Sequence, residues 1–138
     1  MRLQLNNLAF KILTNDPIIR NIRITQGDTF ILDMFFVDIY SYFFPHNMMG
    51  AKVLFTAKRL ISETDGNAAI KHDTVPNPSG LGGEVILRLT SEMTKVPAGN
   101  YIYSVKVVEI NGNITKVMYG NLCIELDPTQ REDNIYEA

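Results

Sequence analysis

The side chains that could carry out chemistry in this 138-residue chain are few and widely spaced. The two histidines, His46 and His72, lack the H-x-x-x-H or C-x-x-C spacing that lets two ligands reach one zinc ion. Cys123, His72 and Asp73 can be combined on paper into a nucleophile system. However, Cys123 falls in the middle of an expected strand, where a lone cysteine usually behaves as a small hydrophobic residue. We therefore expect no metal, no cofactor and no catalytic residue.

Two short motifs also fit roles without chemistry. The run GLGG at residues 80–83 lacks the lysine of a P-loop and the strand-then-helix context in which a glycine-rich loop binds phosphate. It is interpreted as a turn that leads into a strand. Asn113-Ile114-Thr115 matches the glycosylation sequon, but the chain shows no secretion signal. Neither motif indicates an activity.

The composition is that of an ordinary globular domain. Hydrophobic residues make up 46% and charged residues 20%, which is far from the signature of disorder. The length predicts one domain, residues 1–138, with a single core. A net charge of -2 gives no basic footprint for phosphates, so we expect no nucleic-acid partner. Charge is uneven, with a basic N-terminal arm and an acidic tail. The two ends could pair between copies, although a solvated surface is the simpler interpretation.

The sequence favours synthesis in the cytoplasm without export or membrane insertion. A single cysteine, Cys123, allows no intrachain disulfide. Polar residues interrupt the N-terminal 13 residues, which makes them a poor signal peptide. The most apolar stretch, residues 29–45, contains Asp33 and Asp38 and ends at Pro45. A membrane helix needs about 20 mostly apolar residues, so this stretch is not expected to span a membrane.

Alternation of apolar and polar residues predicts an all-β fold, most clearly in a hairpin at residues 101–126. Asn111-Gly112 is the pair typical of a two-residue type I′ turn. Pairing outward from this turn places five pairs on one mostly apolar face. These pairs are Glu109 with Ile114, Val107 with Lys116, Val105 with Met118, Tyr103 with Gly120, and Tyr101 with Leu122. The other face is mixed and at least partly wet.

Five similar runs precede the hairpin and are separated by turn residues. They lie at residues 18–25, 30–37, 51–58, 68–73 and 83–90. Residues 90–96 predict one helical turn, with Thr90 or Ser91 as its N-cap. Seven short strands predict an immunoglobulin-like antiparallel β-sandwich. Its core covers about residues 18–127, between a short N-terminal arm and an acidic C-terminal tail.

The order of turn and strand motifs along the chain follows a known pattern. The motifs are "ITQGDTF" at residues 24–30, "MGAKVLFTAKR" at 49–59 and "ILRLTSEMTKVPAGNYIYSVKVVEING" at 86–112. They resemble the N-terminal immunoglobulin-like domain of the phage baseplate upper protein family. That pattern runs Q-G-D-T, G-A-x-V-x-F, then an L-T-x-x-x-T stretch that leads into G-x-Y-x-Y and a glycine hairpin. Its third part is filled by Leu89, Thr90, Thr94, Gly99, Tyr101 and Tyr103. The resemblance implies a virion structural protein without enzymatic activity, in the baseplate, neck, tail collar or a capsid-fibre anchor.

Residues 29–49 also point to a protein interface. A strand at residues 30–37 is apolar on both faces apart from Asp33, so one face fills the core and the other is a candidate contact. Beyond residue 38 the alternation breaks in an expected surface connection. Aromatic and methionine side chains gather there, at Tyr40, Tyr42, Phe43, Phe44, Met48 and Met49. Such residues are enriched at interface centres, and a monomer rarely exposes a patch this large.

We expect Tyr42, Phe43 and Phe44 to insert into a neighbouring virion subunit. The alternative is that this loop folds back and caps one end of the sandwich. On the first hypothesis the chain is a virion protein that docks against other virion proteins and copies of itself, in several copies per particle. The alternative function is a carbohydrate- or receptor-binding sandwich with exposed aromatic stacking platforms. Few Asp, Asn or Arg residues lie beside the aromatics to bond sugar hydroxyls, which favours docking.

Overall fold

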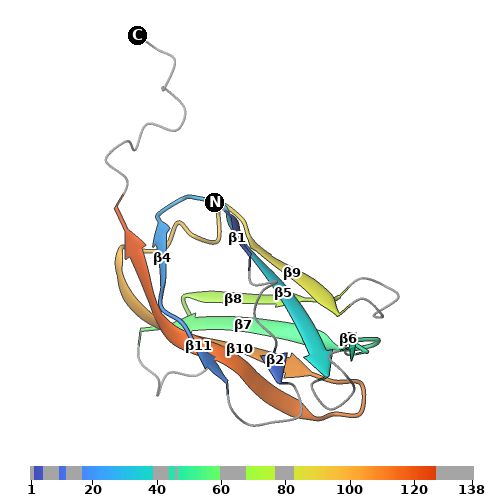
Figure 1. Cartoon of the computed structure of the whole chain (residues 1–138). Helices are drawn as coiled ribbons and strands as arrows, with labels where there is room; N and C mark the ends of the chain where they lie inside the picture. The colour runs from blue at the N-terminus through green and yellow to red at the C-terminus, as the bar shows by residue number, and fades with distance from the viewer. Residues whose placement is uncertain are drawn as a thin grey trace.

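The computed structural model describes the backbone of residues 2–4, 10–11, 17–38, 44–45, 47–59, 68–76 and 83–126, and the side chains of residues 17–36, 47–59, 68–76 and 83–126. These residues form two β-sheets that pack face to face as a β-sandwich (Figure 1). The strands are β1 (Arg2–Gln4), β2 (Phe10–Lys11), β3 (Ile18–Ile19), β4 (Ile22–Thr25), β5 (Phe30–Asp38), β6 (Phe44–Pro45), β7 (Lys52–Lys58), β8 (Ile70–Thr74), β9 (Glu84–Leu89), β10 (Gly99–Val108) and β11 (Ile114–Glu125). In the part of the chain described, no helix has the length and apolar character needed to cross a membrane.

The strand order is that of an immunoglobulin-like domain. One sheet is built around β5, which pairs with β9 and β6 in antiparallel and with β1 and β2 in parallel fashion. The other sheet runs β3-β11-β10-β7-β8, and β4 also lies parallel to β11. The antiparallel series β7, β10 and β11, with β8 added at its edge, is the arrangement of variable-type immunoglobulin domains. The predicted all-β sandwich is confirmed.

Strands form where burial alternates with exposure. Along β7, Val53, Phe55 and Ala57 are buried while the residues between them are not, which matches the two-residue period of a strand with one wet face. The buried side chains of both sheets form one core cluster. Within it the rings of Phe55 and Tyr103 stack with centroids 5.6 Å apart. Such a pair adds about 0.5–1.5 kcal/mol beyond the burial of its area.

All seven predicted strands are present, and the first is divided into β3 and β4. The break falls at Arg20, whose carbonyl accepts a hydrogen bond from the Tyr103 hydroxyl. Gly120 allows this close approach, because a Cβ there would lie 2.3 Å from the Arg20 carbonyl oxygen. The predicted first strand is therefore interrupted at the residue whose carbonyl is bonded by a tyrosine from β10. The short strands β1, β2 and β6 were not predicted.

The register of the β10–β11 hairpin agrees with the prediction only in its outer part. The expected pairs of Tyr101 with Leu122, Tyr103 with Gly120 and Val105 with Met118 are confirmed. A β-bulge then shifts the register between Val105 and Lys106. As a result Lys106, rather than Val107, faces Lys116. Val117 and Met118 are consequently both buried although they are neighbours in sequence.

The hairpin loop also differs from the predicted two-residue type I′ turn. Val108 and Ile114 form the last strand pair. The Gly112 amide donates to the Glu109 carbonyl at 2.8 Å, and the Glu109 amide donates to the Asn113 carbonyl at 2.9 Å. Gly112 has a φ of 90°. This is a β-turn followed by a left-handed glycine, the three-residue loop with a G1 bulge. The prediction of a type I′ turn is therefore wrong, although its glycine still occupies a left-handed position.

Residues 26–29 and 90–97 interlock at one end of the sandwich, and we call this contact the loop junction. The Thr94 hydroxyl donates to the Asp28 carbonyl at 2.6 Å, and the Gly27 amide donates to the Thr94 carbonyl at 3.2 Å. The Gln26 side chain donates to the Val96 carbonyl at 2.8 Å. These bonds join the turn before β5 to the connection between β9 and β10.

The predicted helical turn forms part of this junction. The Thr94 amide donates to the Thr90 carbonyl, and the Met93 amide donates to the Thr90 hydroxyl at 3.4 Å. Thr90 is thus the N-cap of a single turn that does not extend into a helix. At its far side the Tyr101 hydroxyl donates to the Pro97 carbonyl at 2.5 Å. This is the tyrosine corner seen in immunoglobulin-like sandwiches.

Candidate protein interface

The structure places the residues of the predicted interface in different settings. Phe44 contributes backbone to β6, where it pairs with Asp38 at the end of β5. Met48 is 1% exposed and belongs to the core, whereas Met49 is 51% exposed. Tyr40, Tyr42, Phe43 and the side chain of Phe44 lie outside the described residues. For these aromatic residues the interface stays a prediction.

The first half of the apolar stretch at residues 29–49 forms β5, and its side chains lie mainly in the core. On one face of β5, Phe30, Leu32, Met34 and Phe36 are fully buried. On the other face Ile31 and Phe35 are half-buried, and Asp33 is 3% exposed. The second face of β5 is therefore largely covered within the chain itself. It offers less surface to a neighbour than its apolar sequence suggests.

A tight turn at residues 47–50 separates the buried methionine from the exposed one. The Asn47 side-chain oxygen accepts a hydrogen bond from the Met49 amide at 3.0 Å. The Ala51 amide donates to the Met48 carbonyl at 3.0 Å, and Gly50 has a φ of 75°. Asparagine and glycine are the residues that such a turn favours. The turn directs consecutive methionines to opposite environments, and composition alone does not reveal this.

This turn packs against the tip of the β10–β11 hairpin. A Cβ at Gly50 would lie 2.6 Å from Cδ1 of Ile110. Ile110 is itself 76% exposed. Met49, which precedes Gly50, and Ile110 are both exposed, and we call these two residues the hairpin-end patch. It lies at the same end of the sandwich as β6 (Figure 1), which contains Phe44 of the predicted interface.

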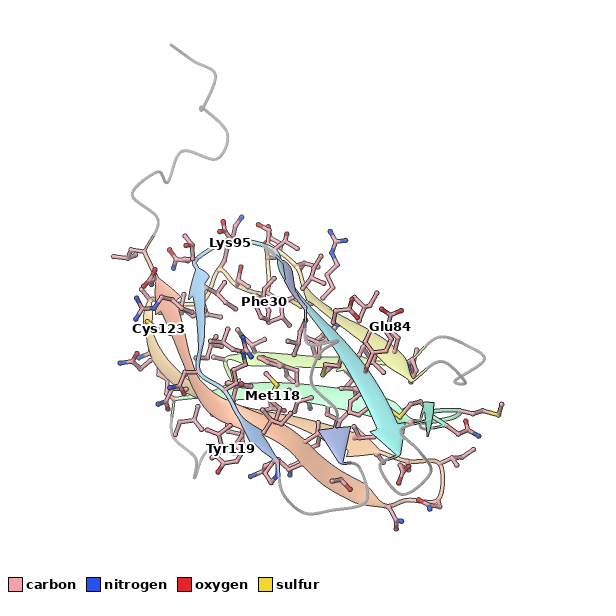
Figure 2. All side chains as sticks on the ribbon, viewed as in Figure 1. Phe30, Glu84, Lys95, Met118, Tyr119 and Cys123 are labelled. Atoms are coloured by element: carbon pink, nitrogen blue, oxygen red, sulfur yellow. The ribbon has the colours of Figure 1, made fainter. Side chains whose placement is uncertain are left out.

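The residues considered for catalysis do not assemble. Cys123 lies on β11 and His72 on β8, with β10 and β7 between them. Three strand spacings correspond to about 14 Å. His72 is the cross-strand partner of the core residue Phe55, whereas Figure 2 shows Cys123 at the outer side of its sheet. The nucleophile system of Cys123, His72 and Asp73 that was considered from the sequence therefore does not form.

Other chemical candidates are equally dispersed. Among the described residues, no group of three or more His, Cys, Asp or Glu side chains could hold a metal ion. His46 lies outside the described residues, and so does most of the glycine run at 80–83. Burial raises the pKa of the Tyr103 hydroxyl above its ordinary value of 10, while the charge of Arg20 partly opposes this shift. The tyrosine stays protonated and serves as a hydrogen-bond donor to the backbone.

One surface feature was not anticipated from the sequence. The outer face of the six-stranded sheet contains a hollow of about 530 Å³, lined in part by Lys58, Lys106 and Lys116. These lysines come from three different strands, so they gather only when β7, β10 and β11 pair. The sequence signal for this cluster was the outward position of each lysine in the alternation of its strand.

No protein-family model matches the chain, and a search of curated proteins finds no relative.

Proposed function

We propose that the chain is a structural component of a bacteriophage virion that docks against other virion proteins and copies of itself. Its place is the baseplate, the tail or neck, or an anchor for head fibres, and its role is architectural rather than enzymatic. The observation that carries this proposal is the loop junction. It brings into contact the residues through which the sequence resembles the phage baseplate upper protein family.

Two motifs of that resemblance are far apart in sequence and adjacent in space. The Q-G-D-T motif supplies Gln26, Gly27 and Asp28, and the L-T-x-x-x-T motif supplies Thr94. The Thr94 hydroxyl donates to Asp28, and the Gly27 amide donates to Thr94. Their contact supports the view that the pattern describes one structural unit.

The pattern residues are used internally, so docking must depend on other surfaces. Thr94, Tyr101 and Tyr103 are all buried, and their hydroxyls are bonded to backbone carbonyls. The end of the sandwich with β6 differs, because Met49 and Ile110 are exposed there. Exposed methionine and aliphatic side chains beside an aromatic sequence suit the centre of a protein interface.

A sugar-binding role has less support from the described residues. A stacking platform for a sugar ring needs an exposed aromatic face. The strongly exposed large hydrophobic side chains in the described part of the chain are aliphatic or methionine. They are Ile19, Met49, Val75, Ile86, Ile102, Ile110, Ile114 and Leu126. This surface fits protein contacts better than carbohydrate stacking.

The test is a double substitution in the aromatic segment, Phe43→Ser with Phe44→Ser. The matched control is Ile19→Ser with Ile86→Ser, which removes two exposed apolar side chains elsewhere. Each variant is assayed for folding by circular dichroism and thermal melting. Incorporation is measured in particles assembled by a phage that lacks the parent gene. We expect the aromatic variant to fold like the parent and to be absent from particles, while the control is incorporated.

Two results would contradict this proposal. Normal incorporation of the aromatic variant would remove these residues from the interface. Unfolding of the purified variant would show that the segment caps the core, and docking would then have to use another surface.

A further inference from the structure

The outer face of the six-stranded sheet is strongly basic. Residues directly opposite on antiparallel strands lie on the same face. Register pairs Lys106 with Lys116 and with Leu54, and it pairs Lys71 with Thr56. The resulting set, which we call the lysine face, is Lys52, Lys58, Lys71, Lys106 and Lys116. Among the described residues of strands β7 to β11 in this sheet, Asp73 and Glu125 are the carboxylates directed to the same side. Glu125 is paired with Arg23 at 3.0 Å.

Three residues of the lysine face, Lys58, Lys106 and Lys116, line a hollow with an apolar floor. The hollow has a volume of about 530 Å³, and Leu54, Ile102, Ile114 and Tyr119 also line it. Ile102 and Ile114 are exposed. Figure 2 shows Met118 directed between the sheets and Tyr119 on the opposite, outer side of β11. The combination of lysines with an apolar floor suits a ligand that carries both carboxylates and apolar side chains.

The register places Lys106 directly opposite Lys116. Like charges directly opposite on neighbouring strands are destabilising. The Lys116 ammonium lies 5.1 Å from the centre of the Tyr119 ring, which places it over the hollow. The β-bulge at Val105 and Lys106 creates this lysine pair, since the regular register would place Val107 there. A bulge that re-aims side chains in this way often accompanies a functional site.

We propose that the lysine face binds residues 127–138 of a second copy of the chain. These residues lie outside the described part, and their sequence has complementary charge. It contains Asp127, Glu132, Asp133 and Glu137 against Arg131. Ile135 and Tyr136 lie between the acidic residues and match the apolar floor of the hollow.

The acidic segment is assigned to this surface because its carboxylates, with Ile135 and Tyr136 among them, complement the lysine face in charge and in apolar character. The test separates a second copy from the same copy, because association between copies depends on protein concentration and docking within one copy does not.

The test is charge reversal with rescue, measured by sedimentation of the full chain at several concentrations. Lys106→Glu with Lys116→Glu reverses the face, and Glu132→Lys with Asp133→Lys reverses the segment. The matched control is Arg88→Glu with Lys95→Glu. Arg88 lies on β9 in the other sheet, and Figure 2 shows Lys95 in the connection beyond β9. Thermal melts check that every variant is folded.

We expect the parent to self-associate at low salt and to dissociate at about 0.5 M salt, because surface charges are then screened. Each reversal weakens association about tenfold or more. Combining both reversals restores association, and the control leaves it unchanged. The test uses the purified chain, so its outcome does not depend on the proposed virion role.

Three results would overturn the proposal. The first is a parent that stays monomeric at every concentration. The second is a reversal of the lysine face that leaves association intact, and the third is a combined variant in which association is not restored. A monomeric parent that binds phosphatidylserine vesicles would instead assign the lysine face to an anionic membrane.

Discussion

The Thr94 hydroxyl is the most direct point at which to test the loop junction. Thr94 is fully buried, and its Oγ1 lies 2.6 Å from the Asp28 carbonyl oxygen and 3.2 Å from that of Ser91. A hydroxyl has one hydrogen to donate, and the shorter distance assigns it to Asp28. Thr94→Val keeps the shape of the side chain and removes this donor.

The expected cost follows from the loss of that bond. A buried carbonyl that loses its partner costs about 1–3 kcal/mol. Asp28 is an exposed residue, so water replaces part of the lost bond, and we expect about 1–2 kcal/mol. For a chain of this size 1 kcal/mol corresponds to roughly 4 °C. The Tm of Thr94→Val should therefore fall by about 4–8 °C.

Urea unfolding followed by circular dichroism measures this cost. The midpoint should fall with an unchanged slope, since the area exposed on unfolding stays the same. Thr56→Val is the control, because Thr56 is a half-buried threonine of β7, and its change should stay within about 0.5 kcal/mol. Gln26→Leu removes a second bond across the junction. Its effect combined with Thr94→Val should be smaller than the sum of the two. A Thr94→Val midpoint equal to that of the parent would refute the reasoning.

Three further predictions concern the hairpin and the buried tyrosine. Gly112→Val should cost about 1–2 kcal/mol in thermal melts, because it forces a branched side chain to a φ of 90°, and Gly112→Asn should cost less; equal melting of all three proteins would contradict this. Lys106→Glu should raise stability by about 0.2–1 kcal/mol, because it replaces a like-charge pair with Lys116 by an opposite-charge pair; a lower Tm would count against the observed register. Stability should decrease above about pH 10, because the unfolded state then releases the Tyr103 proton more readily than the folded state, whose pKa burial raises. Tyr103→Phe should be less stable at neutral pH, since the Arg20 carbonyl loses its donor, and it should show a smaller decrease above pH 10; a pH profile parallel to that of the parent would argue against a buried hydroxyl.

The fold could be predicted from the sequence wherever alternation is long. β10 and β7 alternate over their whole length, and burial of one face fixes their register. The β-bulge escaped prediction because Val117 and Met118 are both apolar, so either can be assigned to the core. Asn111-Gly112 favours a two-residue type I′ turn when considered alone. The bulge shifts the strand register by one residue, and the shifted strands are joined by a three-residue loop instead. Strands of two or three residues, such as β6, have no period to detect.

The candidate surfaces were harder to predict than the strands. Met48 and Met49 are adjacent and chemically identical, and only the turn at residues 47–50 decides which one is buried. Lys106 and Lys116 were expected to have different partners, so no cluster was apparent. Surfaces depend on which strands become neighbours, and this is a property of tertiary pairing rather than of local pattern.

The most direct test of the proposed function is to purify phage particles from cells that carry the gene for this chain and to reconstruct those particles by cryo-electron microscopy. We expect the β-sandwich in several copies, with its β6 end and residues 40–49 packed against a neighbouring subunit. Absence of the chain from the purified particle would contradict a virion role, and a copy with that end in solvent would contradict docking through the aromatic segment.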